Sequence, residues 1–366
     1  MTVIFLITGI LIFVYLAYPI WLLLFQTAAT EKEQETVDIK EVSLILLSFN
    51  GGKYLKEKIG FLMKELSCFP QYEMIIVDDN SSDGSKETLN AFRGTENIII
   101  ITKNEQKGIP HSMNMAVRNA KYDYIIFCDQ RQQLSDHILQ RIVEPLKYRE
   151  VGAVSGCISH LDKENRFSVI RRCENFIKSK ESGAGSLIGV YGPLYAIKKN
   201  CYHVIPEDII LDDLYLSLRI LKNKQIRFSE DCRITDESIS TLYDYKRTRR
   251  YLNGFLQILQ QNILFKELNN KQKIMLIWHK YLRLLIPVFI FLSYFCIGIL
   301  IHQGTGYIIL FTILTVTGLL SFLPVGSKYQ FRLKTLTRMS ILCLVGLVDV
   351  FINKIFSWIK QEPAGS

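Results

Sequence analysis

The sequence predicts an α/β domain built on a parallel sheet, flanked at both ends of the chain by apolar helices. Between residues 42 and 128, short apolar runs rich in β-branched residues alternate with segments of helical spacing. Such runs are typical of parallel strands covered on both faces. Three of the runs end in polar side chains, and long stretches without charge lie near both termini.

The expected elements follow this alternation. Strands are predicted at residues 42–48, 74–77, 97–101 and 124–128, with a further strand within 152–159. Helical spacing predicts helices at 54–66, 112–120 and 209–221, and a helix start at Ser82 and Asp83. Residues 183–186 and 189–193 are glycine-rich and are expected to be loops in which backbone approaches a ligand closely. Residues 246–264 begin with cations and continue as an amphipathic pattern, which suits a helix lying along a membrane.

Polar side chains at the strand ends predict a nucleotide site, because parallel sheets bind ligands at the carboxyl ends of their strands. The side chains concerned are Ser48 and Asn50, Asp78 and Asp79, and Asp129 and Arg131. Asp78 and Asp79 either hydrogen-bond a base or ribose, or cap the following helix.

Two further acidic positions suggest the chemistry of group transfer. Asp129 either holds Mg²⁺ or Mn²⁺ on a nucleoside diphosphate or caps the next helix. Arg131 stands where a second acid would help to hold the metal, and its guanidinium can bind phosphate oxygens directly. Asp212 and Asp213 offer a general base for a hydroxyl acceptor, or simply favourable charge at a helix N-terminus.

A basic and aromatic patch at residues 246–251 contains Arg247, Arg250 and Tyr251. One interpretation is a clamp on diphosphate, with Tyr251 as a platform for an acceptor sugar. The alternative is a basic patch beside a membrane that binds lipid head groups.

The flanks predict membrane helices. Residues 3–25 and 284–327 contain no charged side chain, which is enough apolar length for one and two spans. Residues 339–358 form a third span or an interfacial helix, with Asp349 inside it. Lys and Arg gather in the connectors before and after the second stretch, which predicts a multi-pass protein of the inner membrane with its middle part in the cytoplasm.

Composition agrees with these interpretations. The net charge of +9 suits a phosphate-bearing substrate or an anionic lipid surface. No nucleic-acid motif accompanies the charge, so no nucleic-acid partner is expected. The eight cysteines form no Cys-x-x-Cys pair and are expected to be buried thiols.

As a set, these motifs resemble the membrane-embedded family 2 glycosyltransferases, which include cellulose, chitin and hyaluronan synthases. The resemblance covers residues 40–262 and rests on the first strand, the Asp78-Asp79 tip, the segment from Gly108 to Asn114, Asp129, and the basic patch. It implies a GT-A (nucleotide-diphospho-sugar transferase, Rossmann-like) domain, with Gly108 and Asn114 among the residues that bind the donor nucleotide. Leu211, Asp212 and Asp213 are similar to the family's base motif, with Asp213 in the base position.

The resemblance implies an inverting transferase of the hexosyltransferase type, using a nucleotide sugar and acting on a growing polysaccharide or lipid-linked glycan. Arg131 in place of the second acid predicts a single, weakened Mg²⁺ or Mn²⁺ site. The expected organisation is a transmembrane helix at 1–27, a linker at 28–41, the GT-A domain at 42–262 ending in an amphipathic interface segment, and a membrane region with two to three helices at 263–366. The alternative is a non-catalytic, membrane-anchored nucleotide-binding regulator or subunit of a polysaccharide export complex.

Overall fold

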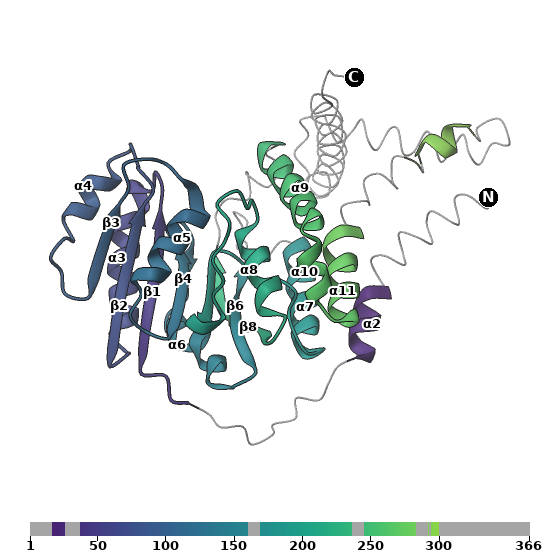
Figure 1. The fold of residues 1–366 in the computed structure, drawn as a ribbon, viewed down its shortest axis with the longest axis horizontal. Coiled ribbons are helices and arrows are strands. Elements are labelled where there is room, and N and C mark those ends of the chain that lie inside the picture. The colour runs from purple at the N-terminus through teal and green to yellow at the C-terminus, as the bar shows by residue number, and fades with distance from the viewer. Residues whose placement is uncertain are drawn as a thin grey trace, which may run out of the picture. The chain divides into compact units, whose positions relative to one another are not determined.

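The computed structural model describes residues 17–25, 37–159, 169–235, 245–282, 292 and 294–299 (Figure 1). The chain divides into two compact units. The first, called the sheet unit below, contains Leu22–Ile239 and Gln261–Gln272. The second contains Met1–Trp21, Ser240–Gln260 and Lys273–Ser366. The domain boundaries expected from the sequence stay predictions.

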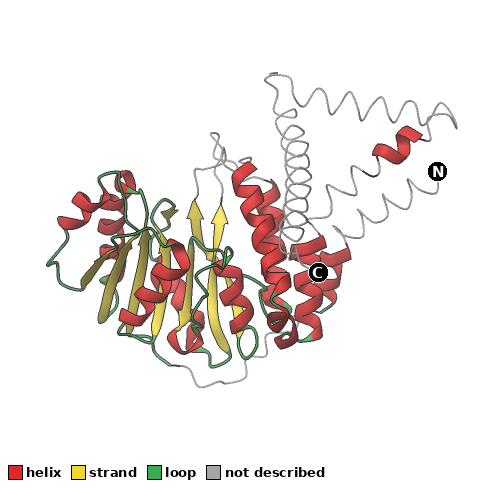
Figure 2. Ribbon diagram, turned by 45° about the horizontal axis from the view of Figure 1, so that its top comes forward, coloured by secondary structure: helices red, strands yellow, loops and turns green. Residues whose placement is uncertain are grey.

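An eight-stranded mixed sheet forms the sheet unit, seen as neighbouring yellow arrows in Figure 2. Its strands are β1 (Glu41–Ser48), β2 (Gln71–Asp78), β3 (Ile98–Thr102), β4 (Tyr124–Asp129), β5 (Gln133–Leu134), β6 (Val151–Ser159), β7 (Leu194–Lys198) and β8 (Gln225–Thr235). The strand order is β3-β2-β1-β4-β7-β6-β8-β5. The first four strands pair in parallel as predicted, whereas β7 is antiparallel to both β4 and β6.

Helices of the sheet unit connect these strands. They are α3 (Gly52–Leu66), α4 (Ser85–Asn90), α5 (Gly108–Asn119), α6 (Ile138–Val143), α7 (Val169–Gly183) and α8 (Asp212–Ile220), with 3₁₀ turns η2 (Glu144–Lys147) and η3 (Lys199–Cys201). Helix α10 (Asn262–Glu267) follows the last strand, and α11 (Asn270–Leu276) crosses the boundary between the two units. The other helical elements are α2 (Tyr18–Leu24), α9 (Tyr245–Gln260) and the π-helix η5 (Ile277–Leu282), and residues 294–299 are also helical.

The two faces of the sheet bury different residues because side chains alternate along each strand. One face packs against α3 and α6 in a single apolar core, which contains Leu44, Ile76, Ile126 and Ala196. The residues between them point to the opposite face. There the ring of Phe127 stacks on Tyr195, directly across the β4–β7 pair, with ring centroids 4.7 Å apart. Asp129 follows Phe127 by two residues, so it lies on this second face at the carboxyl end of β4.

The helices that the structure describes contradict the predicted multi-pass location in the inner membrane. Among those residues, none of the helices combines the length and apolarity that crossing a bilayer requires. Within the first apolar stretch the structure describes α2, which has 7 residues, whereas a span needs about 20. Most residues of the three apolar stretches lie outside the part of the chain that the structure describes.

Candidate functional site

Side-chain hydrogen bonds join the tips of β1 and β2. The backbone N–H of Asn50 donates to Ser81 Oγ (2.9 Å), and Asn50 Oδ1 accepts from the N–H of Ser82 (2.9 Å). Asn50 has a φ of 48°, in the left-handed region that Asn adopts more readily than most residues. Ser48 Oγ is buried and has no hydrogen-bond partner within the described part of the chain. The two tips thus meet at one edge, as the sequence predicts.

Asp78 and Asp79 shape the backbone after β2. Asp78 accepts from both the N–H and the hydroxyl of Ser81. Asp79 accepts from the N–H groups of Lys107 (2.9 Å) and Gly108 (2.8 Å), at the start of α5. Neither acid is the N-cap of α4, whose cap is Gly84.

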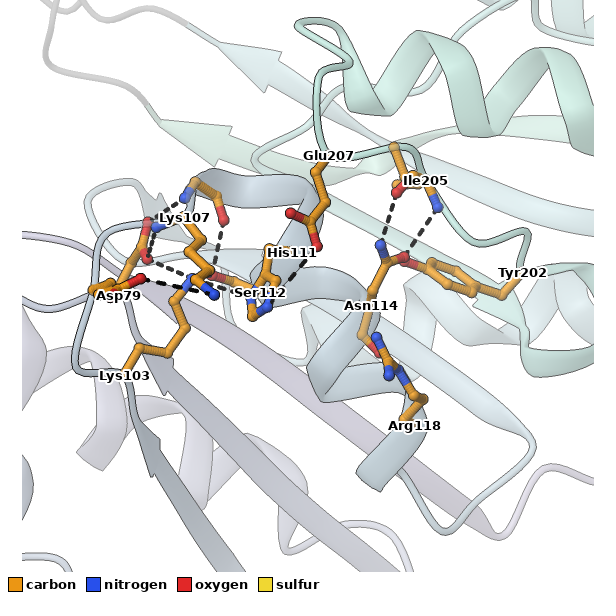
Figure 3. Close-up of polar contacts among 12 residues, drawn as sticks. Asp79, Lys103, Lys107, His111, Ser112, Asn114, Arg118, Tyr202, Ile205 and Glu207 are labelled. Carbon is orange, nitrogen blue, oxygen red and sulfur yellow. Dashed lines mark hydrogen bonds and ion pairs between the residues drawn. The ribbon is translucent and has the colours of Figure 1, made fainter.

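Lys103 neutralises Asp79 inside the protein. Figure 3 shows this ion pair between the two side chains. Lys103 Nζ lies 2.5 Å from Asp79 Oδ1, and both side chains are almost completely buried. Burial raises the pKa of Asp79, but the Lys103 ammonium and the two N–H donors outweigh it, so the pKa is lowered. Asp79 is therefore an ionised anchor between β2, β3 and α5. Its predicted contact with a nucleoside stays a prediction.

Asn114 joins α5 to the segment that follows η3. Its Nδ2 donates to the carbonyl of Ile205 (2.7 Å), while Oδ1 accepts from Tyr202 Oη (2.7 Å) and from the N–H of Ile205 (3.0 Å). Figure 3 shows these contacts on the side of α5 away from Asp79. The Asn114 side chain thus makes three hydrogen bonds within the protein. The segment from Gly108 to Asn114 did not indicate this structural role in the sequence.

The tip of β4 carries Asp129, which is partly exposed, and Arg131, which is exposed. The backbone N–H of Asp129 donates to the carbonyl of Pro193 (3.0 Å). Between the two charged residues, Gln130 turns back and donates from Nε2 to the carbonyl of Phe49 (2.9 Å). The β4 tip therefore contacts both the β1 tip and the loop before β7.

The loop before β7, residues 189–193, contacts both Asp129 and Asp213. Pro193 accepts from Asp129, and the neighbouring Gly192 lies against Asp213, since a Cβ at Gly192 would be 3.5 Å from Asp213 Oδ2. No other heavy atom of the described residues lies within 4 Å of that Cβ position, apart from those of adjacent residues. The carboxylate of Asp213 thus lies next to the loop at Gly192.

Tyr195 lies beneath this group of acids. Its ring is buried, and its hydroxyl has no hydrogen-bond partner within the residues that the structure describes. Burial, followed by the charges of Asp212, Tyr202, Asp213 and Asp129, raises the pKa of Tyr195 well above its usual value. The three carboxylates thus lie close enough for their charges to act on the same buried phenol.

The basic patch belongs to the second unit. Arg247, Arg250 and Tyr251 lie in α9, where Arg250 and Tyr251 are exposed. Their predicted roles at the diphosphate and acceptor stay predictions.

The single acid at the β4 tip, Asp129, suits an ion that is held mainly by its substrate. The described residues contain no group of three or more His, Cys, Asp or Glu side chains that could enclose a metal. Mg²⁺ commonly binds through one or two carboxylates together with substrate phosphates. Asp129 meets that smaller requirement.

Sequence reasoning missed Tyr195, Lys103 and Ser217, all of which contact or surround predicted site residues. Lys103 was the easiest of the three to predict, because it lies two residues after the third predicted strand. Tyr195 and Ser217 also contact residues distant in the sequence, Phe127 and Val190.

Comparison with known proteins finds similarity to glycosyltransferases. Residues 43–192 match the sequence family described as "Glycosyl transferase family 2". Glycosyltransferase GlyG of Streptococcus pneumoniae is 26% identical over 125 residues, covering 34% of this chain and 41% of that protein. The poly-beta-1,6-N-acetyl-D-glucosamine synthase of Staphylococcus epidermidis is 21% identical over 197 residues, covering 51% of this chain and 47% of the synthase. The matches thus span less than half the length of these two relatives.

Among solved structures, the chain is similar to the mannosyltransferase PcManGT from Pyrobaculum calidifontis, in complex with GDP-Man and Mn²⁺. The TM-score is 0.76 at 17% identity, and the match covers 96% of this chain and 99% of that one. At this level of identity the similarity concerns the fold.

Proposed function

We propose that this chain, a transferase with a family 2 glycosyltransferase domain of GT-A fold, moves a sugar from a nucleotide-sugar donor to a hydroxyl group with inversion. One observation carries the proposal: the 189–193 loop contacts Asp129 through Pro193 and Asp213 through Gly192. The proposed metal-holding acid and the proposed base therefore both contact one short loop.

Asp213 is the proposed general base. Its carboxylate accepts the proton of the acceptor hydroxyl as the oxygen attacks the anomeric carbon of the donor. The new glycosidic bond forms as the bond to the diphosphate breaks, and the electron pair leaves with the nucleoside diphosphate. Attack opposite the leaving group inverts the anomeric carbon. The acceptor oxygen is proposed to approach Asp213 beside Gly192, where a Cβ would lie 3.5 Å from Asp213 Oδ2.

Asp129 is proposed to hold a single Mg²⁺ or Mn²⁺ ion on the donor diphosphate. Such an ion, when bound, neutralises negative charge that develops on the leaving group. Arg131 places a fixed cation two residues away, where the planar guanidinium can bind phosphate oxygens. It thereby reduces the need for a second acidic ligand.

The proposed donor is a UDP sugar, and the proposed acceptor is a growing polysaccharide or a lipid-linked glycan. The staphylococcal relative, named as a synthase of an N-acetylglucosamine polymer, supports the polysaccharide acceptor. The tips of β1 and β2 form the proposed nucleoside site, with Ser48 and Asn50 at its edge.

The first test is nucleoside diphosphate release by the purified full chain from UDP- and GDP-sugars, with Mn²⁺ and with EDTA. Release from one donor, abolished by EDTA, is the expected result. Arg131→Ala should slow that release and make it depend more steeply on Mn²⁺. If no donor in the panel were either bound or turned over, the proposed function would be refuted.

A further inference from the structure

The 189–193 loop has no regular secondary structure, yet buried side chains hold its backbone. Lys178 Nζ donates to the carbonyl of Gly189. The N–H of Val190 donates to Ser217 Oγ (3.1 Å), and the N–H of Tyr191 donates to Ser155 Oγ (2.8 Å). These three holding side chains are each 1% exposed or less. Because buried N–H groups without partners are costly, these contacts determine the path of the loop.

Ser217 differs from the other two because it also contacts the helix that carries the proposed base. Its hydroxyl donates to the backbone carbonyl of Asp213 (2.6 Å), one turn earlier in α8. A serine bonding to the carbonyl four residues earlier is common in helices. Accepting a loop N–H with the same oxygen is the unusual feature, because it joins two segments of the site.

Together these contacts form a continuous path from Asp129 to Asp213. Asp129 bonds to Pro193, the loop runs back to Val190, and Val190 bonds to Ser217, which bonds to Asp213. Gly192 meanwhile lies against the Asp213 carboxylate. The loop and the first turn of α8 therefore keep a fixed register while the Ser217 hydroxyl is present.

We propose that Ser217 is a positioning residue for sugar transfer, whose hydroxyl fixes the direction of the Asp213 carboxylate relative to Asp129. The inference rests on the proposed function and adds a residue to it. Ser217 does not reach the substrate, since it is completely buried. Its effect should therefore appear in the chemical step rather than in donor binding.

Ser155 provides a matched control. Both serines are fully buried, and each accepts a hydrogen bond from one of two adjacent loop residues. Ser155 donates to Gly156 and has no such bond to α8, whereas Ser217 bonds to Asp213. Replacing Ser217 by alanine should leave α8 itself intact, because alanine has the highest helix propensity.

The experiment compares Ser217→Ala, Ser155→Ala and Ser217→Thr in the full chain, with the donor that the wild type accepts. Tm should fall by similar amounts in the two alanine variants. In Ser217→Ala, kcat should fall about tenfold to a hundredfold, because small misplacement of a catalytic group is costly. The donor KM should stay nearly unchanged, as expected for a loss confined to the transition state. Ser217→Thr keeps a hydroxyl and should recover most of kcat.

Equal kcat losses in the two alanine variants, or a Ser217→Ala defect confined to donor KM, would overturn the positioning role while leaving the proposed function standing. A wild type that turns over no donor would instead refute the proposed function, and the inference with it. If Ser217→Ala folds too poorly to assay, Ser217→Cys replaces it, since sulfur is a weak hydrogen-bond acceptor. Equal kcat losses in Ser217→Cys and Ser155→Ala, or a Ser217→Cys defect confined to donor KM, would then overturn the positioning role.

Discussion

The buried ion pair between Lys103 and Asp79 should contribute strongly to the stability of the sheet unit. Lys103→Met keeps much of the aliphatic stem but removes the ammonium. The nitrogen lies 2.5 Å from Asp79 Oδ1, and the two side chains are only 5% and 9% exposed. Removing one partner of such a pair costs about 3–5 kcal/mol, because the remaining charge stays buried.

Three further hydrogen bonds modify that figure, one upward and two downward. Lys103 also donates to Ser112 Oγ (2.9 Å), and losing this bond adds about 1 kcal/mol. Asp79 keeps its bonds from the N–H groups of Lys107 and Gly108, which offset part of the lost charge. We therefore expect a loss near the lower limit, about 3 kcal/mol. In a domain of this size that lowers Tm by roughly 6–12 °C.

Urea unfolding followed by circular dichroism measures the effect at pH 7, together with Asp79→Asn and the double variant. The double variant should lose less than the sum of the single losses, since the two residues contact each other. A loss below about 1 kcal/mol for Lys103→Met, or strictly additive losses, would refute the reasoning.

The pH dependence of this stability follows from the lowered pKa of Asp79. A carboxylate with a lowered pKa in the folded state stabilises the protein fully above its unfolded pKa. That contribution disappears as the pH falls through the folded pKa. The stability difference between wild type and Lys103→Met should therefore narrow on acidification below the usual aspartate pKa. A gap that stays constant down to strongly acidic pH would contradict the assigned ion pair.

The remaining predictions concern the site itself. Tyr195→Phe removes a buried hydroxyl without a partner among the described residues, so the free energy of unfolding should stay the same or rise. Tyr202→Phe is its control and should cost about 1 kcal/mol, because that hydroxyl donates to Asn114; a larger loss for Tyr195→Phe would contradict the structure. Gly192→Ala adds a methyl group 3.5 Å from Asp213 Oδ2. Its Tm should change little while transfer falls by about tenfold, and unchanged turnover would show that the acceptor does not approach there.

The first half of the sheet could be predicted from the sequence because β1 to β4 are continuous apolar runs. The second half was largely missed for an opposite reason. In β8, Arg227, Glu230, Asp231 and Arg233 interrupt the apolar residues, so no apolar run marks the strand. Strand β7 has 5 residues and directly follows Pro193, where the pattern gives little signal.

The sequence predicted the types of residue in the site better than the contacts that these residues make. Acids at strand ends do lie at one edge, because that follows from parallel pairing. Asn114, in contrast, bonds to Tyr202 and Ile205, which lie 88 and 91 residues away. Ser217 likewise depends on a loop 27 residues earlier. Such partners depend on tertiary structure and leave no local pattern in a single sequence.

The most direct test of the central claim compares Asp213→Asn with wild type for glycoside formation from the donor found in the panel. Because a general base contributes about 10²- to 10⁴-fold, kcat should fall by that amount. Donor binding should be retained, since Asp213 acts on the acceptor. An Asp213→Asn variant that forms product at the wild-type rate would contradict the account.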